Sequence, residues 1–300
     1  MQSRTLEQAY QHCQTLTGSH YENFPVASVF LPRNLRKPVS AIYTFARMAD
    51  DIADEGNLHP EERTDLLNKA EQSLQLAAAG RPENEPVFIA LSDVLKSHPG
   101  LLEHLLDLLV AFNMDVHKKR YTGFSEVLEY CRFSANPIGR MLLVLFNEAS
   151  DKNLEQSDSI CSALQIINFL QDIYSDYTDR DRIYLAQDEM EKFNITEADL
   201  GKKQPLPHAG EFLDMQIQRV FTMLRQGSPL GVHLPGRVGM ELRMVTLGGW
   251  QILNKIHKRG GCFFISPRLG KPDWLWIMSR GLTRHFQVYS NSIKPFVKLS

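Results

Sequence analysis

Apolar residues recur with the 3.6-residue period of an α-helix along most of this chain. The spacing i, i+3, i+4 and i+7 predicts helices over residues 35–54, 61–79, 101–119, 124–147, 157–176, 211–225 and 237–258. Pro60, Gly80 and Gly123 are among the breakers that separate them. Strand-like alternation is limited to one short candidate, residues 261–265. The pattern predicts an all-α fold forming one domain over residues 1–300.

The composition excludes some partners and compartments. The 33 basic and 35 acidic residues leave a formal net charge of -2, so we expect no nucleic-acid partner. The four cysteines lie far apart with no CxxC pair, which is typical of buried thiols in a reducing compartment. No apolar run reaches the roughly 18 residues that a spanning helix needs. We expect a cytoplasmic protein, and peripheral contact with the inner membrane through a basic, Trp-containing tail at 271–300 stays open.

Two of the predicted helices each carry a stripe of polar residues on a largely apolar surface. Each residue turns a helix by roughly 100°, so the spacings i, i+4, i+7, i+11 and i, i+3, i+7, i+11 both define one narrow face. The first stripe comprises Tyr43, Arg47, Asp50 and Asp54. The second comprises Gln165, Asn168, Asp172 and Asp176.

The aspartates of these stripes predict a magnesium–diphosphate site. Two carboxylates at i and i+4 repel each other on a helix, and a cation relieves that repulsion. Oxygen-only ligands favour Mg²⁺, which takes one or two carboxylates and completes its shell with water and substrate phosphates. A single DDxxD segment is equally typical of a solvated helix face, and the second matching stripe favours the metal site. A di-iron bundle is excluded because no pair of helices carries Glu-x-x-His.

Around the stripes, the sequence resembles the squalene and phytoene synthase family over residues 3–258. FLPRNLRKPVSAIYTFARMADDIADE at 30–55 is similar to the family's first aspartate-rich motif, and LQIINFLQDIYSDYTDRDRIYL at 164–185 is similar to the second. Four segments are similar to the bacterial hydroxysqualene synthase branch: HYENFPVAS at 20–28, YCRFSANPIGR at 130–140, INFLQD at 167–172 and LGGWQIL at 247–253. Gln171 agrees with this, because the presqualene diphosphate synthase branch more often has a basic residue there.

The resemblance implies a prenyl-synthase helical bundle with a central cavity. It implies that four aspartates face each other and hold Mg²⁺ against the substrate diphosphate, namely Asp50, Asp54, Asp172 and Asp176. Arg47 and Arg182 would bind diphosphate oxygens, with Arg180 competing for the second role because the segment after the second motif is one residue longer than usual. His20 would lie near the substrate mouth. Four residues would lie near the reacting centre: Tyr43, Tyr130, Gln165 and Asn168. Asp51 ranks lower, because its i+1 position points it off the stripe.

The implied reaction converts presqualene diphosphate to hydroxysqualene in squalene and hopanoid biosynthesis. Loss of diphosphate leaves a carbocation, which needs a dry, aromatic-lined cavity and is captured by one water. Candidate wall residues are Phe24, Tyr43, Phe45, Tyr130, Phe133 and Phe169, although core packing also explains each of them. Two alternatives stay open. One is head-to-head condensation of two farnesyl diphosphates to presqualene diphosphate, squalene or dehydrosqualene, and the other is a non-catalytic assembly or binding protein. The sequence fixes neither prenyl chain length nor oligomeric state.

Overall fold

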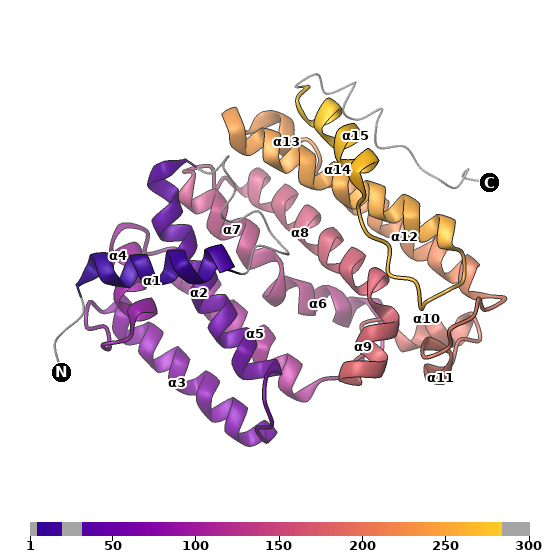
Figure 1. The fold of residues 1–300 in the computed structure, drawn as a ribbon, viewed down its shortest axis with the longest axis horizontal. Helices are drawn as coiled ribbons and strands as arrows, with labels where there is room; N and C mark the ends of the chain where they lie inside the picture. The colour runs from indigo at the N-terminus through magenta and orange to yellow at the C-terminus, as the bar shows by residue number, and fades with distance from the viewer. Residues whose placement is uncertain (1–4, 20–31, 284–300) are drawn as a thin grey trace. The chain divides into compact units, whose positions relative to one another are not determined.

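The structure, a computed structural model, describes residues 5–19 and 32–283 (Figure 1). Helices make up its regular structure, and the described ranges contain no strand beyond one isolated parallel bridge between Tyr121 and Ala186. The all-α prediction is therefore confirmed. His20 and Phe24 lie outside the described residues, as does the rest of the 20–28 segment.

The chain divides into two compact units, and each is described by itself. Unit 1 comprises residues 1–118 and 137–149, and unit 2 comprises residues 119–136 and 150–300. That the two units form one domain over residues 1–300 stays a prediction.

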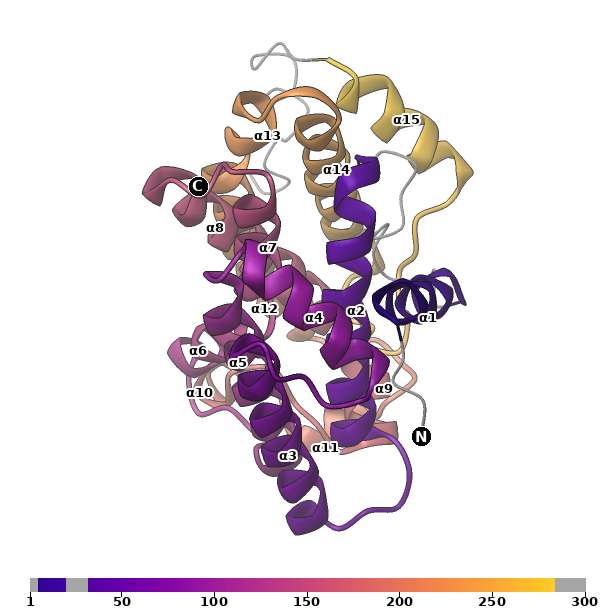
Figure 2. The ribbon, with the colours of Figure 1, turned by 90° about the vertical axis from the view of Figure 1, so that its left-hand side faces the viewer.

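Unit 1 packs its helices around one apolar core. Its elements are α1 (Leu6–Ser19), α2 (Arg33–Asp54), α3 (Pro60–Ala78), α4 (Pro86–Ser97), α5 (Leu101–His117) and α7 (Asn136–Leu145). α2 packs against α1, α4 and α5, as Figure 2 shows from the side of this unit. Phe45 on α2 is fully buried and meets Phe88 of α4 edge-on, with 6.3 Å between ring centroids. Phe45 is therefore a core residue, and its burial directs the polar stripe of α2 away from the core.

The C-terminal end of α2 is fixed by an arginine from α3. Arg63 donates hydrogen bonds to the carbonyl oxygens of Ile52 at 2.6 Å and of Glu55 and Gly56 at 3.0 Å each. The last carbonyls of a helix have no partner within it, so a guanidinium placed there satisfies them. This bonding holds the backbone beside Asp54.

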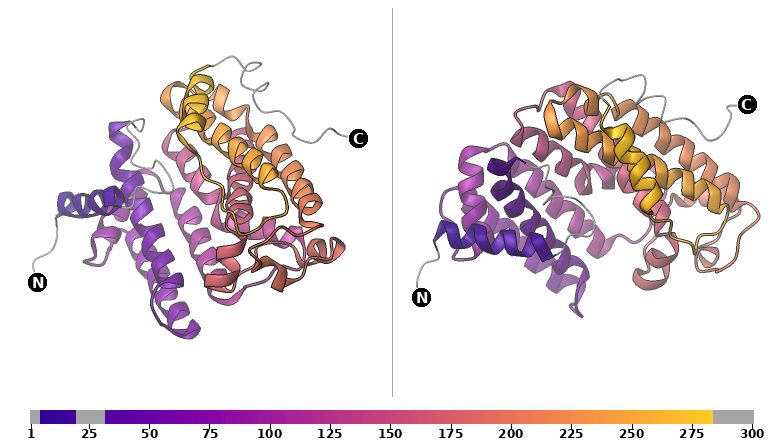
Figure 3. Two further views of the ribbon diagram at one scale, coloured as in Figure 1. Left: turned by 45° about the vertical axis from the view of Figure 1, so that its right-hand side comes forward. Right: turned by 45° about the horizontal axis from the view of Figure 1, so that its top comes forward.

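Unit 2 is built on α8 and the long helices beside it. Its elements are α6 (Phe124–Ser134), α8 (Asp151–Gln171), α9 (Ile173–Arg180), α10 (Gln187–Lys192), α11 (Glu197–Leu200), α12 (Ala209–Gly227), α13 (Leu230–His233), α14 (Gly236–Arg259) and α15 (Lys271–Gly281). α8 packs on α12, α14 and α6, and α15 lies along α14 (Figure 3). α12 and α8 approach closely at Gly227, where a Cβ atom would lie 2.5 Å from the Gln156 carbonyl oxygen.

Two predicted helices are each interrupted. The segment 124–147 forms α6 and α7, which are separated at Ala135. Pro137 has no amide hydrogen to donate to the carbonyl of Phe133 four residues back, so it fits the first turn of α7 but cannot continue α6. The segment 157–176 begins earlier, at Asp151, and is interrupted at Asp172. The strand candidate at 261–265 is wrong, because these residues form a non-repetitive connection between α14 and α15.

Candidate active site

The first stripe lies along α2 of unit 1, with an arginine among its acids. Arg47 Nη1 donates to Asp50 Oδ2 at 3.1 Å, and its Nη2 lies 2.5 Å from Asp51 Oδ1 and 3.8 Å from Glu55 Oε1. Tyr43, Arg47, Asp50 and Asp54 are all partly exposed. The expectation that Asp51 points away from this group is wrong, because the long Arg47 side chain reaches it one turn further along the helix.

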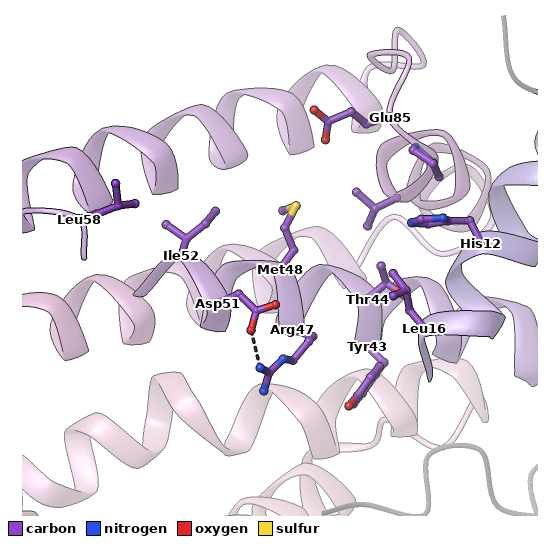
Figure 4. A pocket seen from close by; sticks show the side chains of 12 residues that line it. His12, Leu16, Tyr43, Thr44, Arg47, Met48, Asp51, Ile52, Leu58 and Glu85 are labelled. Carbon is purple, nitrogen blue, oxygen red and sulfur yellow. Dashed lines mark ion pairs between the residues drawn. The ribbon is translucent and has the colours of Figure 1, made fainter. Parts of the chain in front are cut away.

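A pocket of about 480 Å³ adjoins the C-terminal half of α2. Its apolar lining includes Leu16 from α1, Met48 and Ile52 from α2, and Val87 from α4. Tyr43, Arg47 and Asp51 supply polar groups, and Figure 4 shows the Arg47–Asp51 ion pair among the lining residues. An apolar hollow with a few polar groups is typical of a site for a small ligand.

The second stripe lies in unit 2 and continues across the helix interruption. Asp172 adopts φ −106° and ψ 20° between α8 and α9. Its amide still donates to the Asn168 carbonyl at 3.0 Å, and its carbonyl accepts from the Asp176 amide at 2.8 Å. Asn168 is exposed, whereas Gln165, Asp172 and Asp176 are partly exposed. These two backbone bonds continue the i to i+4 pattern of α8 across the break into α9.

Two residues that the sequence analysis missed contact Asp172. The Ser266 hydroxyl donates to Asp172 Oδ1 at 2.7 Å, and Arg268 Nη2 lies 3.7 Å from the same oxygen. Both come from the connection between α14 and α15, which carries no periodic pattern. No signal in the sequence could have found them.

The two candidate arginines after the second motif differ in burial. Arg182 is buried, and its amide donates to the Asp176 carbonyl at 2.9 Å. The chain reaches it through Asp181, which has a left-handed backbone with φ 51°. Arg180, the last residue of α9, is exposed.

A cluster of four aromatic rings lies beside the second stripe. Phe169 stacks on Tyr184 with 4.0 Å between centroids, and Tyr130 lies 5.4 Å from Tyr184 and 5.8 Å from Tyr121. The parallel bridge between Tyr121 and Ala186 brings Tyr121 close to Tyr184. The sequence analysis identified neither of these two tyrosines. Phe133 is half-buried, with the Arg132 guanidinium 5.2 Å from its ring centroid.

The donor atoms fit magnesium with a phosphate ligand. Within the described ranges, no group of three or more His, Cys, Asp or Glu side chains is arranged to hold a metal ion. Mg²⁺ does not require such a group, because one or two carboxylates suffice when water and phosphate complete its octahedron. Asp50 and Asp54 in unit 1, and Asp172 and Asp176 in unit 2, offer carboxylate oxygens of the kind Mg²⁺ prefers.

Comparison with known proteins defines the class and then the family. The sequence model of the squalene/phytoene synthase family matches residues 17–274. The hydroxysqualene synthase of Rhodopseudomonas palustris is 36% identical over 239 residues, covering 79% of this chain and 80% of that protein. The crystal structure of squalene synthase HpnC from Alicyclobacillus acidocaldarius matches with a TM-score of 0.79 at 33% identity, over 85% of this chain and 95% of that one. A dehydrosqualene synthase structure shares the fold, with a TM-score of 0.80 at 22% identity, over 92% of this chain and 96% of that one.

The fold and these relatives define an isoprenoid synthase. The chain belongs to the squalene/phytoene synthase family. Its similarity to hydroxysqualene synthases, predicted from the motifs, is confirmed. In the part of the chain that the structure covers, no helix has the length and apolarity to cross a membrane.

Proposed function

We propose that this chain converts presqualene diphosphate to hydroxysqualene. The C–O bond to diphosphate breaks with its electron pair leaving on the diphosphate, and the cyclopropylcarbinyl cation rearranges. One water adds through its oxygen and loses a proton, so the reaction needs no reductant. The observation that carries the proposal is the similarity to a hydroxysqualene synthase over 80% of its length, with both aspartate pairs present.

We propose that both stripes bind Mg²⁺ and the substrate diphosphate. Asp50 and Asp54 would supply the metal-binding carboxylates of unit 1, and Asp172 and Asp176 those of unit 2. Bound Mg²⁺ would supply charge stabilisation for the departing diphosphate. Arg47 supports this assignment because its forked guanidinium matches phosphate oxygens, and it already lies against the Asp50 carboxylate. Of the two later arginines we assign Arg182 to the diphosphate, because burial and its bond to the Asp176 carbonyl fix its backbone at the second stripe.

The remaining site residues are assigned to the carbocation. Tyr130 and Phe169 belong to the aromatic cluster, whose ring faces attract positive charge without offering a strong nucleophile. Tyr43, Gln165 and Asn168 supply polar groups next to the diphosphate ligands in their own units. We also assign His20 to the substrate mouth.

A second candidate reaction uses the same groups. Head-to-head condensation of two farnesyl diphosphates also begins with loss of diphosphate, and the dehydrosqualene synthase fold is shared. Purified enzyme should be incubated with Mg²⁺ and either presqualene diphosphate or farnesyl diphosphate, and the products separated by gas chromatography. Hydroxysqualene from the first substrate and no coupled product from the second supports the proposal. Conversion of farnesyl diphosphate alone would replace it with the condensation, and no turnover of either would favour a non-catalytic assembly or binding role.

We further propose that α15 contacts an anionic membrane surface from the cytoplasm. Trp274, Leu275 and Met278 lie on one face of the helix with 51%, 71% and 50% of their surface exposed. Lys271 lies on the same face at the N-terminal end. The opposite side packs on α14, because Ile277 is fully buried and Trp276 stacks on Trp250 of α14 with 5.2 Å between centroids. Trp276 therefore packs on the protein, whereas Trp274 is exposed.

The charge around α15 favours an anionic partner. Its one acid, Asp273, is paired with Lys255 at 2.9 Å, while Arg268 and Lys271 are exposed. Basic residues near an anionic leaflet contribute about 1 kcal/mol each, and tryptophan favours the headgroup region. The proposed substrate and product are long hydrocarbons that partition into the same bilayer. Arg280 is partly exposed, with its guanidinium 5.0 Å from the Trp276 ring centroid. Arg284, Lys294 and Lys298, the remaining basic residues of the predicted tail, lie outside the described residues.

Vesicle co-sedimentation tests this contact. The wild type should sediment with phosphatidylglycerol vesicles at low salt and not with phosphatidylcholine vesicles, and a Trp274→Ser/Leu275→Ser variant should stay in the supernatant. A variant that sediments like the wild type would overturn the proposal. Light scattering without vesicles gives a second test. A molar mass that differs between the wild type and the variant would also overturn the proposal, because this face would then be a contact between copies of the chain.

A further inference from the structure

The helix break at Asp172 leaves backbone carbonyls without partners inside a helix, and one side chain from α14 satisfies them. α8 ends at Gln171 and α9 begins at Ile173. Arg259 Nη2 donates to the Leu170 carbonyl at 2.5 Å, and its Nη1 donates to the Gln171 carbonyl at 3.4 Å. A guanidinium in this position stabilises the end of α8 in the way a C-terminal cap does.

The same guanidinium anchors the segment that follows α14. Gly260 has φ +61°, a left-handed conformation that favours glycine, and it turns the chain at the end of α14. Arg259 Nη1 also donates to the Ile265 carbonyl. From the other side, the buried Gln171 amide donates to the Pro267 carbonyl at 2.7 Å. Arg259 and Gln171 therefore hold the residues on either side of Ser266 against the helix break.

Ser266, fixed between these two anchors, touches the candidate metal ligand. Its hydroxyl donates to Asp172 Oδ1 at 2.7 Å, and the Arg268 contact at 3.7 Å uses the same oxygen. Both contacts leave Asp172 Oδ2 for a metal ion. Hydrogen bonds of this kind fix the orientation of a metal-binding carboxylate, and removing such a partner usually costs about 10- to 100-fold in metal affinity.

The Arg259 side chain is held by backbone rather than by a carboxylate. Its three acceptors are carbonyl oxygens, and its Nε is buried with no hydrogen-bond partner among the residues described. Burial lowers the pKa of the guanidinium to about 10, so it still carries its proton at neutral pH, and the nearby Asp172 carboxylate favours that charge. The guanidinium therefore joins two segments of backbone, the end of α8 and the connection after α14, through these three acceptors.

We propose that Arg259 is a positioning residue for the magnesium–diphosphate site. It sets the break in the second stripe and, by anchoring Ile265, places the Ser266 hydroxyl that orients the Asp172 carboxylate. Gln171 shares this task through Pro267. At Gln171 the presqualene diphosphate synthase branch is expected to have a basic residue, and here the glutamine side-chain amide donates to the protein backbone. The inference rests on the proposed function only for the identity of the bound metal and diphosphate.

A metal titration without turnover tests the proposal. Four proteins are compared with the wild type: Arg259→Met, Ser266→Ala, their double variant, and Lys258→Met as the matched control from the neighbouring exposed position. Thermal melts with fixed inorganic pyrophosphate and increasing Mg²⁺ give the Mg²⁺ concentration for half-saturation. Each single variant should raise it about tenfold, and the control should leave it unchanged. The double variant should resemble Ser266→Ala, because a residue that acts through Ser266 adds nothing once the hydroxyl is gone.

If Arg259→Met does not fold, Arg259→Lys keeps the charge without the fork and should still raise the midpoint severalfold. Two results would overturn the positioning role of Arg259 and leave the proposed metal–diphosphate site standing. One is an unchanged Mg²⁺ midpoint in a folded Arg259 variant. The other is a double variant whose Mg²⁺ midpoint rises by the product of the two single-variant increases. If the wild type itself shows no shift with Mg²⁺ and pyrophosphate, the metal–diphosphate site is wrong, and this inference falls with it.

Discussion

Replacing Arg47 with methionine should damage turnover far more than folding. Arg47 makes ion pairs with Asp50, Asp51 and Glu55, in which the side chains are 37% to 70% exposed. Pairs this exposed contribute roughly 0.3–0.5 kcal/mol each, so their loss should destabilise the fold by about 1 kcal/mol. In a chain of this length that corresponds to a decrease in Tm of about 2 °C.

The expected effect on catalysis is much larger. A guanidinium that contacts the diphosphate stabilises charge that appears only as the C–O bond breaks, and loss of one such donor costs about 10²- to 10³-fold in kcat. Pyrophosphate release from presqualene diphosphate at saturating Mg²⁺ measures this loss, and thermal melts measure stability. Arg33→Met is the control, because Arg33 is an exposed residue at the start of the same helix. An Arg47→Met variant with kcat within threefold of wild type, or with a Tm lowered by more than about 8 °C, would refute the reasoning.

Three further predictions address the metal site and the fold. Asp50→Ala or Asp172→Ala should abolish turnover while circular dichroism stays helical, and a wild-type rate would contradict the two-stripe mechanism. Mg²⁺ and pyrophosphate together should raise Tm by more than the sum of their separate effects, because each completes the other's coordination; merely additive shifts would count against a shared site. Glu189→Gln should cost about 3 kcal/mol at pH 7 and flatten the loss of stability below about pH 4.3, as urea unfolding at several pH values would show.

The sign of the Glu189 effect follows from its partners. Burial acts to raise its pKa, but two hydrogen bonds from Arg219, at 2.5 and 3.1 Å, and one from Gln216 at 2.7 Å hold the pKa of this carboxyl below its usual value. A lowered folded-state pKa contributes stability above the unfolded value of about 4.3, and that stability is lost as pH falls through the folded value. An unchanged acid dependence in the variant would mean that the pair does not stabilise the fold.

The extent of the long helices could be predicted from sequence, because local patterns determine it. The predicted helix at 35–54 corresponds to α2 at Arg33–Asp54, and that at 237–258 to α14 at Gly236–Arg259. The interruption at Asp172 could not be predicted, since the apolar period continues through it. Its stabilising partner, Arg259, is distant in the chain and reaches it only after α14 has packed on α8.

In the candidate site, too, local patterns could be predicted and contacts from distant parts of the chain could not. The stripe residues were identifiable because side chains at helical spacing share a face whatever surrounds them. Ser266 and Tyr121 were not, since Ser266 lies on an irregular connection and Tyr121 meets Tyr184 through a single isolated bridge. Asp51 was misplaced because the position of a Cβ atom on the helix does not describe the reach of an arginine side chain.

The central claim is that water, and not a reductant or a second prenyl diphosphate, ends the reaction. The most direct test incubates the enzyme with purified presqualene diphosphate and Mg²⁺, without NADPH, in ¹⁸O-labelled water, and examines the product by mass spectrometry. The account predicts hydroxysqualene carrying one ¹⁸O atom. Hydroxysqualene without the label, or no product until NADPH is added and then squalene, would contradict it.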